Sequence, residues 1–66
     1  MPLVQISMRE GRTREQKRRL VRLVTEAMVE AVGARRERVT VVIHELPAED
    51  WATGGLLLAD EEGGRC

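Results

Sequence analysis

The sequence contains few of the residues that cross-link a small protein or hold a metal ion. Its 66 residues include one cysteine, Cys66, and one histidine, His44. A single cysteine excludes a disulfide within the chain. One cysteine and one histidine are also too few ligands for a structural zinc site. A chain this short buries little of its surface and usually needs disulfides, a metal or oligomerisation. We therefore expect it to be stabilised by oligomerisation.

Long apolar runs are also missing. No segment is apolar over a length that spans a bilayer, and no charged-then-apolar leader opens the chain. We therefore expect no membrane association and a cytoplasmic location. Gly54 and Gly55 indicate a tight turn rather than a phosphate cradle, because no helix start follows them. The sequence predicts no cofactor and no metal.

Charge is balanced overall but unevenly distributed. Residues 1–38 hold ten of the eleven basic residues and five acids, whereas residues 39–66 hold one basic residue and six acids. The two parts therefore carry about +5 and −5. Such an uneven distribution of charge calls for a physical explanation.

Five basic residues fall on one predicted helix: Arg14, Lys17, Arg18, Arg19 and Arg22. They offer nucleic-acid binding as a remote alternative function. Against it, the sequence has no phenylalanine or tyrosine for base stacking, a net charge of zero and no known nucleic-acid motif. A solvated face, or one paired with the acidic tail of a neighbouring chain, fits better, so no nucleic-acid partner is expected.

The first two elements have clear boundaries. Loose alternation predicts a strand over residues 2–8, with Val4, Ile6 and Met8 on its apolar face, and Gly11 ends it. Thr13, with a glutamine three residues later, fits a capping box. The apolar positions that follow keep a 3.6-residue period: Leu20, Leu23, Val24, Ala27, Met28 and Ala31. Gly33 suits a left-handed cap, so the helix is predicted over residues 14–32.

The β-branched run at residues 39–43 predicts a second strand, buried on both faces as in a parallel sheet. A strand, a helix and a strand in this order form a βαβ unit. Pro47 ends the second strand, and residues 47–53 form a loop. The apolar residues 56–58 could pair with another subunit, and residues 59–66 are predicted to be a disordered tail.

These elements predict one α+β domain over residues 1–66, a single β-α-β unit with parallel strands and a C-terminal turn or hairpin. Two strands and one helix cannot enclose a core, and the sheet keeps open edges. We therefore expect the sheet to extend into dimers, which then assemble into a ring.

An ordered set of features resembles the 4-oxalocrotonate tautomerase family. The set comprises Pro2, the segment EGRTREQKRRL, the strand VTVVIHE, and a loop with Trp51 ahead of two glycines. The resemblance covers residues 2 to about 58 and implies a hexamer built as a trimer of dimers. It also implies an isomerase that interconverts the enol and keto forms of a small unsaturated 2-hydroxy or 2-oxo acid.

The resemblance further implies roles for single residues. Pro2 would be the general base, Arg12 would bind a substrate carboxylate, and Trp51, where phenylalanine is usual, would line the pocket. The arginine usual on the second strand is replaced by Thr40. Three substitutes remain open: Arg38, expected on the same side as Thr40; Arg9, as a second clamp beside Arg12; or an arginine of a partner chain in a hetero-hexamer.

Pro2 can act as a base only after the initiator methionine is removed, which is usual before a small residue. An ordinary α-amino group has a pKa of about 7.7–8.0. An apolar pocket and nearby arginines would lower the pKa of the Pro2 amine, because both disfavour its charged form. If Met1 is retained, the nitrogen is a tertiary amide and cannot be a base.

Two further alternatives stay open. The chain could be a non-catalytic or partner-dependent subunit of a hetero-hexameric tautomerase. It also resembles the trans-3-chloroacrylate dehalogenases, in which an arginine pair is similar to Arg9 and Arg12. Thr53 stands near the place of their water-activating glutamate, which makes dehalogenation the weaker hypothesis.

Overall fold

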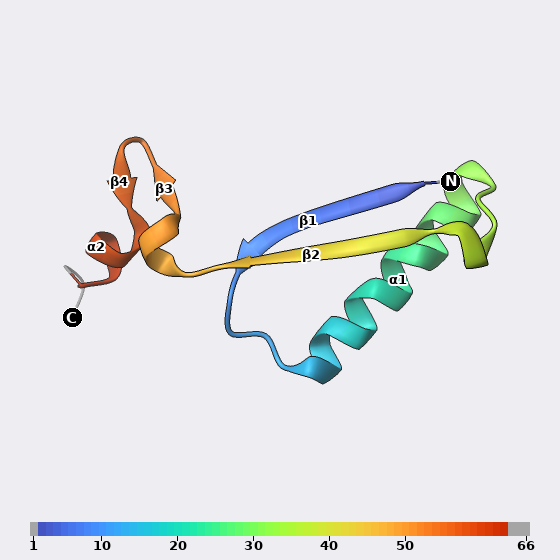
Figure 1. The fold of residues 1–66 in the computed structure, drawn as a ribbon, viewed down its shortest axis with the longest axis horizontal. Coiled ribbons are helices and arrows are strands. Elements are labelled where there is room, and N and C mark those ends of the chain that lie inside the picture. Colours follow the sequence, from blue (N-terminus) through green and yellow to red (C-terminus); the bar gives the residue numbers. More distant parts are fainter. Residues whose placement is uncertain (1, 64–66) are drawn as a thin grey trace.

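The computed structural model describes residues 2–63 and contains a β-α-β unit followed by a small hairpin (Figure 1). The regular elements are β1 (Leu3–Arg9), α1 (Arg14–Val32), η1 (Arg36–Arg38), β2 (Thr40–Leu46), η2 (Ala48–Asp50), β3 (Ala52–Thr53), β4 (Leu56–Leu57) and α2 (Leu58–Gly63). No helix in this part of the chain is long and apolar enough to cross a bilayer.

Strands β1 and β2 pair in parallel, in a register that runs from Leu3 opposite Thr40 to Arg9 opposite Leu46. Helix α1 makes the crossover and covers one face of the two strands (Figure 1). The alternation predicted for the first strand is confirmed, because Val4, Ile6 and Met8 are half-buried whereas the residues between them are exposed. The β-α-β fold class is therefore confirmed.

Both ends of α1 lie where the sequence predicts them. The Thr13 side chain accepts a hydrogen bond from the Gln16 backbone at 3.1 Å, and the Gln16 side chain accepts one from the Thr13 backbone at 2.9 Å. Together they form the capping box. At the other end, Gly33 has a φ of 69° and donates to the Val29 carbonyl at 3.1 Å. These caps satisfy backbone groups that a helix otherwise leaves unpaired.

The apolar stripe of α1 is rotated from its predicted position. Leu20, Val24 and Met28 are half-buried against the sheet, but Leu23 is 52% exposed and Ala27 is also exposed. Lys17 is half-buried on the sheet-facing side instead. Leu23 therefore belongs to an outer surface of α1 rather than to its contact with the strands.

None of the residues from 2 to 61 is buried in the single chain. The accessible surface is 5212 Å² for a mass of 7.4 kDa, against about 4200 Å² for a compact monomer of that mass. The radius of gyration is 15.4 Å, against about 11 Å for a compact chain of this length. The expectation that the second strand is buried on both faces is wrong for one chain, because α1 covers only one of them.

Residues 47–63 form a projecting unit, which we call the arm (Figure 1). Strands β3 and β4 make an antiparallel hairpin, in which Gly54 and Gly55 have φ of 62° and 82°. Two successive positive φ angles suit a tight hairpin turn, and glycine adopts them without strain. The predicted turn is confirmed.

The prediction of a disordered tail over residues 59–66 is wrong where the structure describes it. Residues Leu58–Gly63 form the short helix α2, which packs against η2. Asp60 and Glu61 lie in its first turn, where negative charge is favourable. Residues 64–66 lie outside the described part of the chain.

Replacing Thr13 with alanine removes the side-chain acceptor that begins α1. We expect the free energy of unfolding to fall by about 1 kcal/mol. Denaturant unfolding at one fixed protomer concentration would measure it, because association also affects apparent stability. Thr13→Ser keeps the hydroxyl and should retain most of the stability; equal losses in the two variants would contradict the role of the cap.

Candidate functional site

Pro2 lies at the start of the sheet and is half-buried. Its carbonyl accepts a hydrogen bond from the Thr40 N–H at 3.0 Å, so Pro2 and Thr40 are at the same end. This bond fixes the backbone of Pro2 against β2. Thr40 pairs with Leu3, and both side chains are exposed on the sheet face that α1 leaves open.

Arg38 is close to this end in the chain but is not placed as expected. It is the last residue of the 3₁₀-helix η1, and its N–H donates to the Arg35 carbonyl at 2.8 Å. Side chains two residues apart share a face only in an extended strand. Because Arg38 is in a 3₁₀-helix, strand alternation no longer predicts that it faces the same side as Thr40.

Arg12 lies at the opposite end of β1, in a turn that is held on both sides. Glu10 donates its N–H to the Leu46 carbonyl at 3.0 Å, and Thr13 belongs to the capping box. Gly11 between them has a φ of 122°, which a side chain would strain. The turn thus holds the Arg12 backbone in a defined position.

The Arg12 side chain borders a hollow of about 270 Å³. The other lining residues are Met8, Gln16, Lys17 and Leu20. Lys17 is ion-paired with Glu45 of β2, which ties the first turns of α1 to the sheet beside this hollow. This ion pair was not predicted from the sequence. The feature that indicates it is the position of Lys17, three residues before Leu20 on the helix side that faces the sheet.

Arg9 and Trp51 lie apart from that hollow. Arg9 is the last residue of β1, next to Met8, so strand alternation puts it on the other face. Trp51 is in the arm, half-buried, with its carbonyl accepting from the Leu58 N–H at 2.7 Å. Neither residue lines the hollow beside Arg12.

One chain therefore does not bring the predicted site residues together. Strand β1 spans seven residues, or roughly 20 Å at about 3.3 Å per residue. This length separates Pro2 and Arg38 at one end from Arg9 and Arg12 at the other. Trp51 lies farther out, in the arm beyond the end of β2 (Figure 1).

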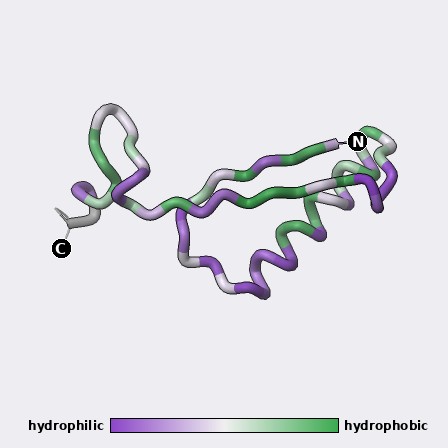
Figure 2. The backbone as a smooth tube through the Cα atoms, viewed as in Figure 1, coloured by the Kyte–Doolittle hydropathy of each residue, from purple (hydrophilic) through white to green (hydrophobic). Residues whose placement is uncertain are grey.

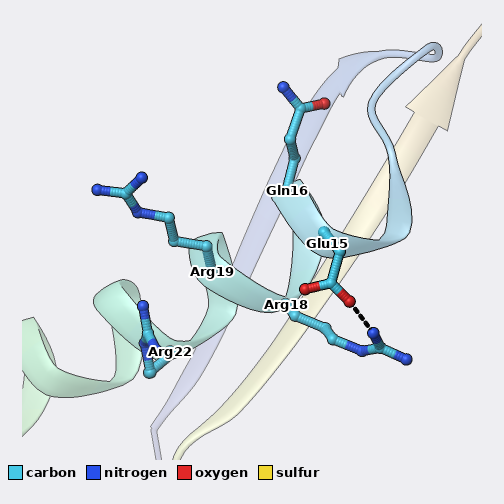
Figure 3. A pocket seen from close by; sticks show the side chains of 5 residues that line it. All are labelled: Glu15, Gln16, Arg18, Arg19 and Arg22. Carbon is cyan, nitrogen blue, oxygen red and sulfur yellow. Dashed lines mark hydrogen bonds and ion pairs between the residues drawn. The ribbon is translucent and has the colours of Figure 1, made fainter.

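A second, open hollow of about 540 Å³ lies along the first half of α1. Its lining residues, which we call the arginine face, are Glu15, Gln16, Arg18, Arg19 and Arg22. Arg18 is ion-paired with Glu15, whereas Arg19 and Arg22 extend away from that carboxylate (Figure 3). No group of three acids, histidines or cysteines gathers as metal ligands within residues 2–63.

A match to a protein-family model identifies the family of the chain. The family model described as "Tautomerase enzyme" matches residues 2–61. The chain belongs to the tautomerase family. The resemblance found in the sequence is thereby confirmed, and so is its class as a 4-oxalocrotonate tautomerase-like isomerase.

Individual tautomerases are similar along most of the chain. A 2-hydroxymuconate tautomerase of Comamonas testosteroni is 50% identical over 85% of this chain and 89% of its own length. The solved structure of a 4-oxalocrotonate tautomerase isozyme from Methylibium petroleiphilum is 52% identical, with a TM-score of 0.83, and covers 88% of this chain and 94% of its own. A heterohexamer 4-oxalocrotonate tautomerase from Chloroflexus aurantiacus is 37% identical, with a TM-score of 0.86, covering 91% and 97%.

Removing the partner of Glu45 tests how much the Lys17–Glu45 ion pair stabilises this tautomerase. The side chains of Lys17 and Glu45 are 32% and 27% exposed, so Lys17→Met leaves a carboxylate half-buried without its cation. We expect a loss of about 1 kcal/mol in the free energy of unfolding. Adding Glu45→Gln should recover part of it.

The exposed pair on the same helix is the matched control. Arg18 and Glu15 are 63% and 78% exposed, so Arg18→Ala should cost less than about 0.5 kcal/mol. Equal losses for Lys17→Met and Arg18→Ala in denaturant unfolding would contradict a special role for the Lys17–Glu45 pair.

Proposed function

We propose that this tautomerase interconverts the enol and keto forms of a small unsaturated 2-hydroxy or 2-oxo acid such as 2-hydroxymuconate. The main support for this proposal is the 50% sequence identity between this chain and a 2-hydroxymuconate tautomerase over most of both chains. The reaction moves one proton from one end of a conjugated system to the other. It requires a group that accepts a proton and then returns it.

Pro2 is the proposed proton carrier. With Met1 removed, its nitrogen is a secondary amine on a backbone that the Thr40 hydrogen bond holds against β2. A base fixed in this way loses little entropy when it is aimed at the substrate. Arginines and apolar walls contributed by an assembled site would lower the pKa of the amine and keep more of it neutral near pH 7.

Arg12 is the proposed carboxylate clamp. A guanidinium binds a carboxylate through two parallel hydrogen bonds, and these are stronger than bonds between neutral groups. Met8 and Leu20 border the same hollow, and apolar walls next to a charge pair strengthen the attraction between the charges. A nearby positive charge also stabilises the negative charge that develops on the substrate as the proton leaves.

The site is proposed to form between chains. Pro2 and Arg12 are separated by the length of β1 in one chain, and that chain buries no residue between 2 and 61. Both outer edges of the two-stranded sheet are open to further pairing. A two-fold axis that pairs two such edges antiparallel would put the start of β1 in one copy near the end of β1 in the other. We propose this sheet extension for dimers, and further association into a hexamer.

The substitute for an arginine at Thr40 remains open. Thr40 lies beside Pro2, and its exposed side chain carries no charge. Arg9, Arg38 and an arginine of a partner chain are all retained as proposed second clamps, with Trp51 as a proposed pocket wall. The uncharged Thr40 also favours a second candidate function, a subunit that depends on a different partner chain for activity, as in a hetero-hexamer.

Replacing Pro2 with alanine should lower turnover of 2-hydroxymuconate by orders of magnitude, because the ring-constrained secondary amine is replaced by a more mobile primary amine. An ultraviolet assay of the conjugated acid would follow the reaction, and intact mass would confirm that Met1 is absent from both proteins. Pro47→Ala changes the other proline and leaves the N-terminus unaltered. Activity retained in Pro2→Ala would rule out Pro2 as the base.

Replacing Arg12 with alanine should lower kcat/KM about tenfold to a hundredfold, mainly through a higher KM, because a charged hydrogen-bonding partner of the substrate is lost. Co-expressing Pro2→Ala with Arg12→Ala should restore about a quarter of the parent sites if each site draws these residues from two copies mixed at random. Activity no higher than that of the two variants assayed apart would contradict a shared site.

A further inference from the structure

Lys17 differs in position from the other basic residues of α1. Hydrophilic residues gather along the first half of this helix (Figure 2). Of the five basic side chains on α1, only that of Lys17 is half-buried, and the other four are exposed. Lys17 is also the only one of the five that lines the hollow beside Arg12. It is therefore placed to contact a ligand in that hollow.

The hollow that Lys17 shares with Arg12 is small and has walls of two kinds. Its volume is about 270 Å³, below the range of about 300–1,000 Å³ that is typical of pockets for drug-sized ligands. Met8 and Leu20 supply apolar surface, whereas Arg12 and Lys17 supply positive charge. A small acid with an unsaturated carbon chain has features that match both kinds of wall.

The two cations of the hollow differ in how their charge is balanced. Arg12 takes part in no ion pair formed by residues 2–63, whereas Lys17 is paired with Glu45 of β2. An ammonium carries three N–H donors. Glu45 accepts a hydrogen bond from one of them, so two remain for a ligand. Two cations and one carboxylate leave this group with a formal charge of +1, which a single substrate carboxylate neutralises.

The two arginines of this chain that were retained as second clamps do not line the hollow. Arg9 and Arg38 are both absent from its walls, whereas Lys17 is present. Lys17 and Arg12 also belong to the same chain, so their placement in one hollow does not depend on how copies of the chain associate. The hollow thus has a second cation without the strand arginine that Thr40 replaces.

We propose that Lys17 binds the same substrate carboxylate as Arg12. This inference rests on the carboxylate clamp proposed for Arg12 and adds a second residue to it. The Lys17 ammonium donates a charge-assisted hydrogen bond to the carboxylate while it remains bonded to Glu45. Glu45 competes with the substrate for this ammonium, so it stabilises the fold and at the same time weakens substrate binding.

Three variants separate a substrate contact from a contribution to stability. Lys17→Met removes the cation and should raise the KM for 2-hydroxymuconate about tenfold, with kcat changed less than about twofold. Glu45→Gln keeps the cation and removes the competing carboxylate, so its KM should equal that of the parent or be lower. The double variant Lys17→Met with Glu45→Gln has no unpaired carboxylate but still lacks the cation, so its KM should remain about tenfold higher.

A purely structural role for Lys17 predicts the opposite pattern. Lys17→Met and Glu45→Gln both break the ion pair, so they would then raise KM alike, and the double variant would recover toward the parent together with its stability. Either result would overturn the proposal. Denaturant unfolding of each variant would give the folded fraction to which kcat is normalised.

Two further variants control for charge and for side-chain type. Arg19→Met makes the same change of net charge on the same helix but outside this hollow, and its KM should stay within about twofold of that of the parent. Lys17→Arg keeps a cation and should recover most of the affinity. An equal rise in KM for Arg19→Met and Lys17→Met would assign the effect to the overall field of the protein and overturn a local contact.

The outcomes distinguish this proposal from the function on which it rests. A parent chain that does not turn over 2-hydroxymuconate would overturn the proposed function and the role of Lys17 with it. An active parent in which Arg12→Ala raises KM and Lys17→Met does not would overturn the role of Lys17 alone. A KM raised by Lys17→Met but not by Arg12→Ala would overturn the sharing of one carboxylate.

Discussion

The parallel pairing of β1 with β2 is the constraint on which the rest of this structure depends. Parallel strands need a crossover connection, and here that connection is the single helix α1. One helix covers one face of the sheet, so the other face and both edges stay open. Residues 2–63 contain no further long helix or strand to close them. The described residues therefore leave apolar surface exposed, which the association proposed above would bury.

The same strand also sets the geometry available for catalysis. A strand is extended and stiff, so residues before and after β1 are held apart by its length. Pro2 and Arg12 occupy those two positions, and each is fixed locally by backbone hydrogen bonds or caps. Each chain thus holds separate halves of a possible site in rigid positions. Repetition of the chain can combine them without any conformational change.

Local signals in the sequence predicted the elements well. The capping box at Thr13, the left-handed Gly33 and the turn at Gly54 and Gly55 each depend on a few neighbouring residues, and all three are present. The site residues could be named only through the family resemblance. Their separation into three places follows from strand length, which composition does not reveal.

The predictions from the sequence that failed concern properties that depend on contacts between residues far apart in the chain. The β-branched run at 39–43 predicts a strand buried on both faces, yet the single chain covers one face, because a β-branched run does not reveal which element covers each face of the strand. Helix α2 was missed because its six residues are too few to give a periodic pattern, and its packing against η2 stabilises it. For Arg38, the argument from alternation does not apply, because a 3₁₀-turn replaces the extended backbone that alternation assumes.

The position of Trp51 connects assembly with the active site. It is the sole aromatic residue of the chain, and it lies in the arm together with the exposed Leu56 and Leu57. If the arm reaches a neighbouring copy, the contact that buries these leucines also carries Trp51 to that neighbour. Stability and the completeness of the pocket would then depend on the same association. If the association forms as proposed, the chain would lose both together on dilution, because residues 2–61 have no buried core to sustain the fold alone.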